Sequence, residues 1–128
     1  MKNLPARIAA VALGIPMIVF GLNKFLLFAN VAPPADKTAQ MFLGAMFTSY
    51  LAKLVGLSEI IGGGLVLWGT TRTLGWLVLS PVMINIVAFH FAHDLPGNMI
   101  WLFSTAAFLA VMVFERASLT ATLTAGLK

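Results

Sequence analysis

The sequence predicts an all-α integral membrane protein, a four-helix bundle with an extra interfacial helix between its first and second spanning helices. Hydrophobic residues make up 60% of the chain and charged residues 9%, whereas soluble domains carry about 25% charged residues. The apolar residues form four long runs, each near or above the roughly 18 residues that cross a bilayer as a helix. No polar connection is long enough to fold alone, so the 128 residues form a single transmembrane domain. The runs are Leu4–Phe28, Met41–Trp68, Thr73–Phe91 and Met99–Phe114.

The first run predicts a helix from Pro5 to Phe28. Proline suits the first helical turn, where its missing N–H would have no partner in any case. Basic residues ahead of the run resemble a signal peptide, but Ile8–Phe28 is long for the apolar region of one. We therefore expect a retained helix, followed by a proline-containing loop over Asn30–Asp36.

The second run is longer than one perpendicular crossing needs, and two interpretations are open. It is either one tilted helix or two pieces joined near Gly56. We favour two pieces, in which Asp36 caps an interfacial helix over Lys37–Val55 and the second span covers about Leu57–Gly69. Inside that span, Gly62–Gly64 predicts close packing against the first or third helix. The alternative is a hinge or a backbone that faces a ligand.

The second half of the chain predicts two further helices. A turn over Thr70–Thr73 leads to a helix over Thr73–Phe91, and a second turn over His93–Asn98 leads to a helix over Pro96–Glu115. Pro96 fits the first turn of that last helix. The tail, Ala117–Lys128, is rich in Thr, Ala and Leu and predicts a frayed helix.

The basic residues predict the orientation in the membrane. The chain has eight Lys and Arg against four Asp and Glu, a net charge of +4. Most of them flank apolar runs, so they indicate membrane orientation and no nucleic-acid partner. More of them fall on the side of the two termini, which places both termini in the cytoplasm, and we expect a bacterial cytoplasmic membrane. The terminal side holds Lys2, Arg7, Arg72, Arg116 and Lys128, and the opposite side holds Lys24, Lys37 and Lys53.

Four polar residues fall at membrane depth, and all four fall in the outer half of the predicted bundle. These candidate ligand-binding residues are Lys24, Glu59, Asn85 and His90. Buried charges usually pair, so Lys24 and Glu59 are either a structural ion pair or the charged wall of a ligand pocket. Asn85 is either an interhelical contact or a pocket donor, and His90 could donate a hydrogen bond to a quinone carbonyl.

Several kinds of chemistry are disfavoured. The chain has no cysteine, which excludes thiol redox chemistry by its own residues. His90, His93 and Asp94 offer too few ligands for a metal site, so we expect no metal. No residue pattern identifies a catalytic group, and whether the protein is an enzyme stays open.

Three segments give the chain a resemblance to the DoxX-like small integral membrane proteins, the DoxX/DoxD group. The resemblance covers about Arg7 to Phe114. It implies a four-helix membrane bundle associated with quinone-linked oxidoreductases, in which Lys24, Glu59, Asn85 and His90 match the family pattern. Some relatives bear cysteines, whereas this chain has none. The three segments, besides Arg7, are Gly21-Leu22-Asn23-Lys24, Val55-Gly56-Leu57-Ser58-Glu59-Ile60-Ile61-Gly62-Gly63-Gly64-Leu65 and Pro81-Val82-Met83-Ile84-Asn85-Ile86-Val87-Ala88-Phe89-His90.

These observations lead to one functional expectation and two alternatives. We expect a subunit or accessory of a quinone-linked membrane oxidoreductase, with membrane lipid, a quinone and other membrane or redox subunits as partners. The first alternative is a structural or assembly protein without ligand chemistry. The second is an oligomeric small-molecule transporter, which the apolar inner half of the bundle disfavours. A homo-oligomer is compatible with all three.

Overall fold

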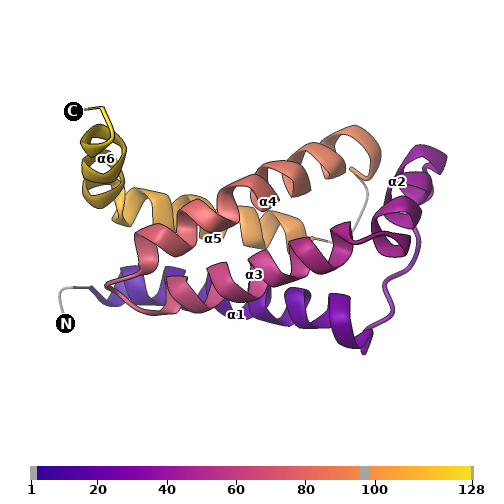
Figure 1. Ribbon diagram of the computed structural model, residues 1–128, viewed down its shortest axis with the longest axis horizontal. Coiled ribbons are helices and arrows are strands. Elements are labelled where there is room, and N and C mark those ends of the chain that lie inside the picture. The colour runs from indigo at the N-terminus through magenta and orange to yellow at the C-terminus, as the bar shows by residue number, and fades with distance from the viewer. Residues whose placement is uncertain (1–2, 96–98, 128) are drawn as a thin grey trace.

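In the computed structural model, which describes residues 3–95 and 99–127, the regular structure is entirely helical (Figure 1). The prediction of an all-α protein is confirmed. In the described residues the helices are α1 (Leu4–Leu26), α2 (Lys37–Thr48), α3 (Leu51–Leu67), α4 (Arg72–His93), α5 (Ile100–Phe114) and α6 (Arg116–Ala125). The predicted start of the last span at Pro96 lies outside the described residues.

Two of these helices, α1 and α4, are each long and apolar enough to cross a membrane. Two further crossings are available if each bent pair of helices counts as one broken span, since α2 meets α3 at 80° and α5 meets α6 at 72°. In Figure 1, α1, α3, α4 and α5 run along the long axis of the molecule, while α2 and α6 project at opposite ends. We call these the α2 end and the α6 end.

The second apolar run is indeed divided, but not where the sequence suggested. The break lies at Ser49 and Tyr50, because Ser49 takes an extended conformation after α2. Gly56, the predicted junction, lies inside α3 and packs against α1 instead. The predicted cap is present, since the Asp36 carboxylate accepts a hydrogen bond from the backbone N–H of Thr38 at 3.2 Å.

Glycines allow α3 to touch both of its neighbours. A Cβ added to Gly63 would lie 2.7 Å from the carbonyl oxygen of Gly14 in α1, and one added to Gly62 would lie 2.7 Å from Leu79 in α4. A larger residue at Gly63 would therefore have to separate α3 from α1, whereas one at Gly62 would first displace the side chain of Leu79. The prediction of close packing against the first and third spans is confirmed for these two glycines, whereas Gly64 has nothing within 4 Å of its added Cβ.

The first span ends slightly earlier than Phe28, for a local reason. Leu27 adopts a left-handed conformation, with φ at 51°, and ends α1. The side chain of Asn23 bonds the backbone of Ala29 in both directions, at 2.8 and 3.2 Å. These bonds hold the chain in the turn, and they replace the helical bonds that would have continued α1.

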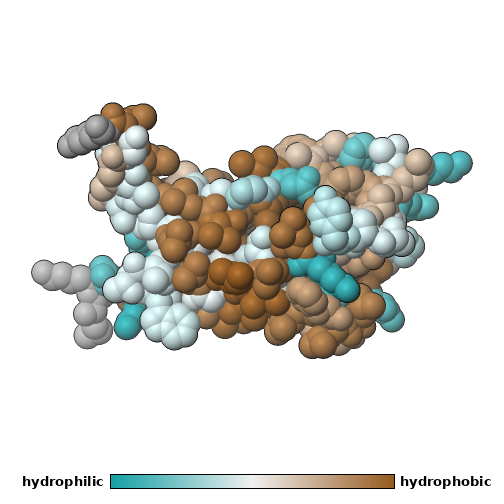
Figure 2. Space-filling model, in the orientation of Figure 1, coloured by the Kyte–Doolittle hydropathy of each residue, from teal (hydrophilic) through white to brown (hydrophobic). Residues whose placement is uncertain are grey.

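Apolar side chains fill the centre of the molecule and also cover much of its surface. Among the fully buried ones are Leu13, Met17, Val66 and Leu79. Ile84, Phe91 and many other large apolar side chains are exposed, and hydrophobic residues dominate the middle of the face shown in Figure 2. Water-soluble monomers rarely expose so continuous an apolar surface, so the surface is that of a membrane protein.

Candidate functional site

Lys24 and Glu59 form an ion pair inside the helix packing. The Lys24 ammonium lies 2.6 Å from a carboxylate oxygen of Glu59. Glu59 is 1% exposed, so Lys24 and not solvent compensates the charge of its carboxylate. A buried charge is tolerated only when it is paired. Each partner therefore makes the other acceptable in an apolar core.

The register of α1 and α3 explains how two residues at different levels meet. Gly21 faces Gly56 and Gly14 faces Gly63, so the helices are antiparallel and Lys24 lies about 9 Å nearer the α2 end than Glu59. Side chains lean toward the start of their own helix. Lys24 therefore leans away from the α2 end and Glu59 leans toward it, and the two side chains converge.

The other two predicted site residues do not contact this pair. Asn85 is exposed, and its side chain makes no hydrogen bond to any residue that the structure describes. His90 lies on α4 about 12 Å nearer the α2 end than Val82, the residue level with Glu59 in the α3–α4 register. The structure thus brings together Lys24 and Glu59 and separates them from Asn85 and His90.

His90 belongs to a different cluster, at the contact between α4 and α5. Its ring stacks on that of Trp101, with the ring centres 5.0 Å apart and the planes 6° from parallel. Its Nδ1 lies 3.3 Å from a carboxylate oxygen of Asp94 but off the direction of a hydrogen bond. In the described part of the chain, Nδ1 of His90, Nε1 of Trp101 and Oγ of Ser104 are buried without a hydrogen-bond partner.

Sequence reasoning missed Trp101 and Ser104. Trp101 sits near the end of an apolar run, where tryptophans usually mark the membrane interface, yet here it is 6% exposed. Ser104 was overlooked because a single serine in an apolar helix usually bonds its own backbone. The available signal was their spacing of three, which places both on one face of α5.

The α2 end carries a second histidine pair, between His93 and Asp36. Nδ1 of His93 lies 2.7 Å from a carboxylate oxygen of Asp36, which links the start of α2 to the end of α4. The side chain of His93 is about one third exposed although it has this partner. Desolvation acts to raise the pKa of Asp36, but hydrogen bonds from His93 and from backbone N–H groups outweigh it and lower that pKa from 3.8.

The ion pair between Arg72 and Glu115, at the α6 end, was not predicted. The Arg72 guanidinium donates to the Glu115 carboxylate at 3.2 Å and to the carbonyl of Val66 at 3.1 Å. Thr73 bonds both Glu115, at 3.4 Å, and Ser118, at 2.9 Å. These contacts fasten the α3–α4 turn to the junction of α5 and α6, and they show that buried charge is not confined to the α2 half.

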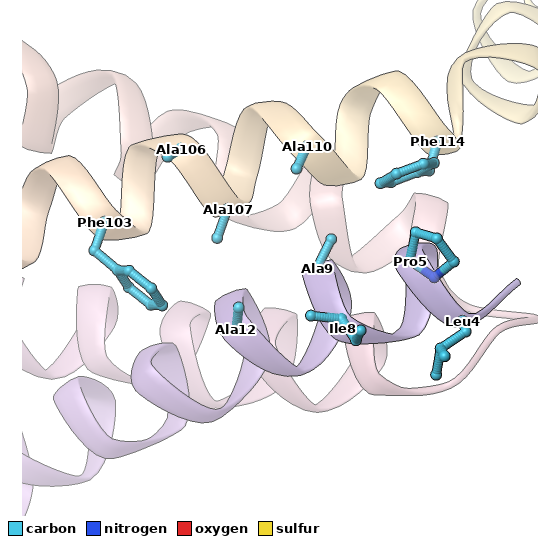
Figure 3. A pocket seen from close by; sticks show the side chains of 10 residues that line it. All are labelled: Leu4, Pro5, Ile8, Ala9, Ala12, Phe103, Ala106, Ala107, Ala110 and Phe114. Carbon is cyan, nitrogen blue, oxygen red and sulfur yellow. The ribbon is translucent and has the colours of Figure 1, made fainter.

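Two apolar grooves lie on the sides of the molecule. One, of about 420 Å³, lies between α1 and α5, and its lining includes Ala9 and Ala12 of α1 and Ala106, Ala107 and Ala110 of α5 (Figure 3). The other, of about 570 Å³, lies between α4 and α5. The residues that line the groove between α4 and α5 are Met83, Ile84, Val87, Ala88, Phe91, Thr105, Phe108 and Leu109. Neither groove is lined by any of the four predicted site residues.

Neither a metal-site search nor the comparisons with known proteins assigns a function to the chain. Within residues 3–95 and 99–127, no three His, Cys, Asp or Glu side chains come together as a metal site would require. Comparisons with protein-family models, with curated proteins and with solved structures find no match for this chain. The resemblance to the DoxX-like group therefore rests on the sequence segments alone.

Proposed function

We propose that the protein is a small integral membrane protein of the DoxX-like kind that binds the head group of a small amphiphile, with a quinone as the leading candidate. In this proposal it is an accessory subunit of a membrane oxidoreductase. Its four long helices cross the membrane, and both termini lie in the cytoplasm. The apolar surface of the helices and the placement of α2 and α6 at opposite ends support this arrangement.

The ligand proposal rests on the buried Nδ1 atom of His90, which has no hydrogen-bond partner among the described residues. The ring that carries this atom is stacked on the buried Trp101. Buried polar atoms are rarely left unpaired, and an exception calls for a missing partner. Because imidazole can donate or accept a hydrogen bond, a ligand carbonyl at this place would satisfy it.

Binding of decylubiquinone to the purified protein in lipid nanodiscs tests the proposal. We expect saturable binding by the natural chain and roughly tenfold weaker binding by His90→Ala, because one ligand hydrogen bond is lost. The Lys24→Met, Glu59→Gln double variant shows whether the charged pair takes part. Absent binding by the natural chain, or unchanged binding by His90→Ala, would contradict the proposal.

A structural role is the second candidate, and the Lys24–Glu59 pair favours it. The two charges satisfy each other at 2.6 Å next to the Gly21–Gly56 contact, so the pair can hold α1 against α3 without a ligand. A protein of this class would assemble with other membrane proteins without binding a ligand. It predicts that the double variant keeps both its fold and its place in any complex.

A further inference from the structure

The buried face of α5 carries two hydrogen-bond donors that have no acceptor in the described part of the chain. Trp101 is 6% exposed and Ser104 is 1% exposed. Nε1 of Trp101 and Oγ of Ser104 have no partner among the described residues. They lie one helical turn apart on the buried face of α5, and the ring of Trp101 stacks on that of His90.

Ser104 differs in this respect from the other hydroxyl residues of the long helices. Ser58 bonds the carbonyl of Leu54 at 3.0 Å, Ser80 that of Trp76 at 2.8 Å, and Thr105 that of Trp101 at 2.7 Å. A helical serine can nearly always make this local bond. The hydroxyl of Ser104 makes no such bond among the described residues.

The apolar groove between α4 and α5 leads to this cluster. Phe91 lines the groove and meets Trp101 edge to face, with ring centres 5.6 Å apart. Thr105 and Phe108, which also line it, follow Ser104 within the next turn of α5. Trp101 therefore contacts both Phe91, which lines the groove of about 570 Å³, and the ring of His90.

We infer that this groove and cluster form the ligand site, for an amphiphile with an apolar tail and a planar head group that carries a ring carbonyl. The tail lies in the groove, and the carbonyl oxygen accepts hydrogen bonds from Nε1 of Trp101 and Oγ of Ser104. The indole N–H can only donate, so the ligand must supply an acceptor. This inference rests on the proposed function and assigns the head group's hydrogen bonds to Trp101 and Ser104, beside His90.

Two conservative variants test the site with decylubiquinone as the probe, in nanodiscs and by calorimetry. Ser104→Ala removes one donor, and Trp101→Phe removes the other while it keeps an aromatic ring beside His90. We expect each to weaken binding by roughly tenfold. The matched control is Ser80→Ala, whose hydroxyl is already bonded within α4 and whose loss should leave the affinity unchanged.

The ligand-free stability separates a lost contact from a damaged fold. Because the Ser104 hydroxyl has no partner, Ser104→Ala should melt at the same temperature as the natural chain or higher. Probe binding by the natural chain that neither Ser104→Ala nor Trp101→Phe weakens would overturn this site and leave the proposed function standing. An equal loss in Ser80→Ala would overturn it too. No binding by the natural chain would overturn the proposed function and the site together.

Discussion

At the scale of single residues, the two charges of the Lys24–Glu59 pair are each stable in the core only because the other is present. Coulomb attraction between the partners offsets the loss of solvation only while both are present. Its burial and its 2.6 Å separation make it sensitive to the removal of either partner alone. The pair therefore has a clear signature in a double-mutant cycle.

We expect Glu59→Gln or Lys24→Met alone to destabilise the protein by about 3–5 kcal/mol, because each leaves one buried charge without compensation. The double variant removes both charges and should lose much less than the sum of the two. Unfolding in mixed micelles with increasing denaturing detergent measures all four proteins. Additive losses would show that the two side chains do not interact as the structure has them.

Asp36 predicts a dependence on pH at the α2 end. Its pKa is lowered in the folded protein, so its contribution to the docking of α2 is complete above the unfolded pKa of about 3.8. That contribution is lost as the pH falls through the lower, folded pKa. A fluorophore on Ala45→Cys, an exposed position of α2, should therefore report a change of environment below about pH 4.

Asp36→Asn is the control for this transition. Asparagine caps a helix about as well as aspartate, but it has no charge to lose in this range. The acid transition should be absent in Asp36→Asn. A transition of the same size in both proteins would assign the change to other groups.

At the scale of the helices, the adjacent glycines of α3 give a matched pair of variants. Gly63→Ala places a methyl group 2.7 Å from the Gly14 carbonyl, and the backbone must move. We expect a loss of about 1–3 kcal/mol. Gly64→Ala meets open space and should be neutral, or stabilising by up to about 1 kcal/mol.

The same unfolding titration compares the two glycine variants side by side. Gly63 and Gly64 are neighbours in α3, so the two variants have nearly the same depth in the molecule and the same gain in helix propensity. A difference between their stabilities therefore reports the contact with α1. Equal effects of Gly63→Ala and Gly64→Ala would argue against direct backbone contact between α1 and α3.

The helices themselves were predictable, whereas their breaks and contacts were less so. Apolar run length identified the long helices, and the Asp36 cap identified the start of α2. The break at Ser49 and Tyr50 was missed because Gly56 was the more obvious helix breaker, yet close packing can outweigh the low propensity of glycine.

Within the candidate site, opposite charge on sequential helices was enough to predict the Lys24–Glu59 contact. The positions of Asn85 and His90 depend on helix rotation and register, which a hydropathy pattern does not fix. The Arg72–Glu115 pair depends on the 72° bend between α5 and α6, and nothing in an apolar run encodes that angle.

At the scale of the whole molecule, polar contacts secure the two ends and apolar packing fills the space between. Asp36 and His93 tie α2 to α4 at one end, and Arg72 and Glu115 tie the α3–α4 turn to α5 and α6 at the other. The charged Lys24–Glu59 pair is the exception inside the bundle. This distribution matches a membrane core bounded by two aqueous interfaces.

The sidedness of the molecule can be measured by labelling single cysteines, because the chain has no cysteine of its own. Three exposed positions serve as single labels: Ala45 in α2, Thr70 in the α3–α4 turn and Ala121 in α6. If the four long helices cross the membrane with the termini inside, a membrane-impermeant maleimide added to intact cells should label Ala45→Cys alone. Thr70→Cys and Ala121→Cys should react only after permeabilisation, since both lie toward the α6 end. Labelling of Ala45→Cys and Ala121→Cys from the same side would mean that the bent pairs re-enter rather than cross, and the proposed topology would be wrong.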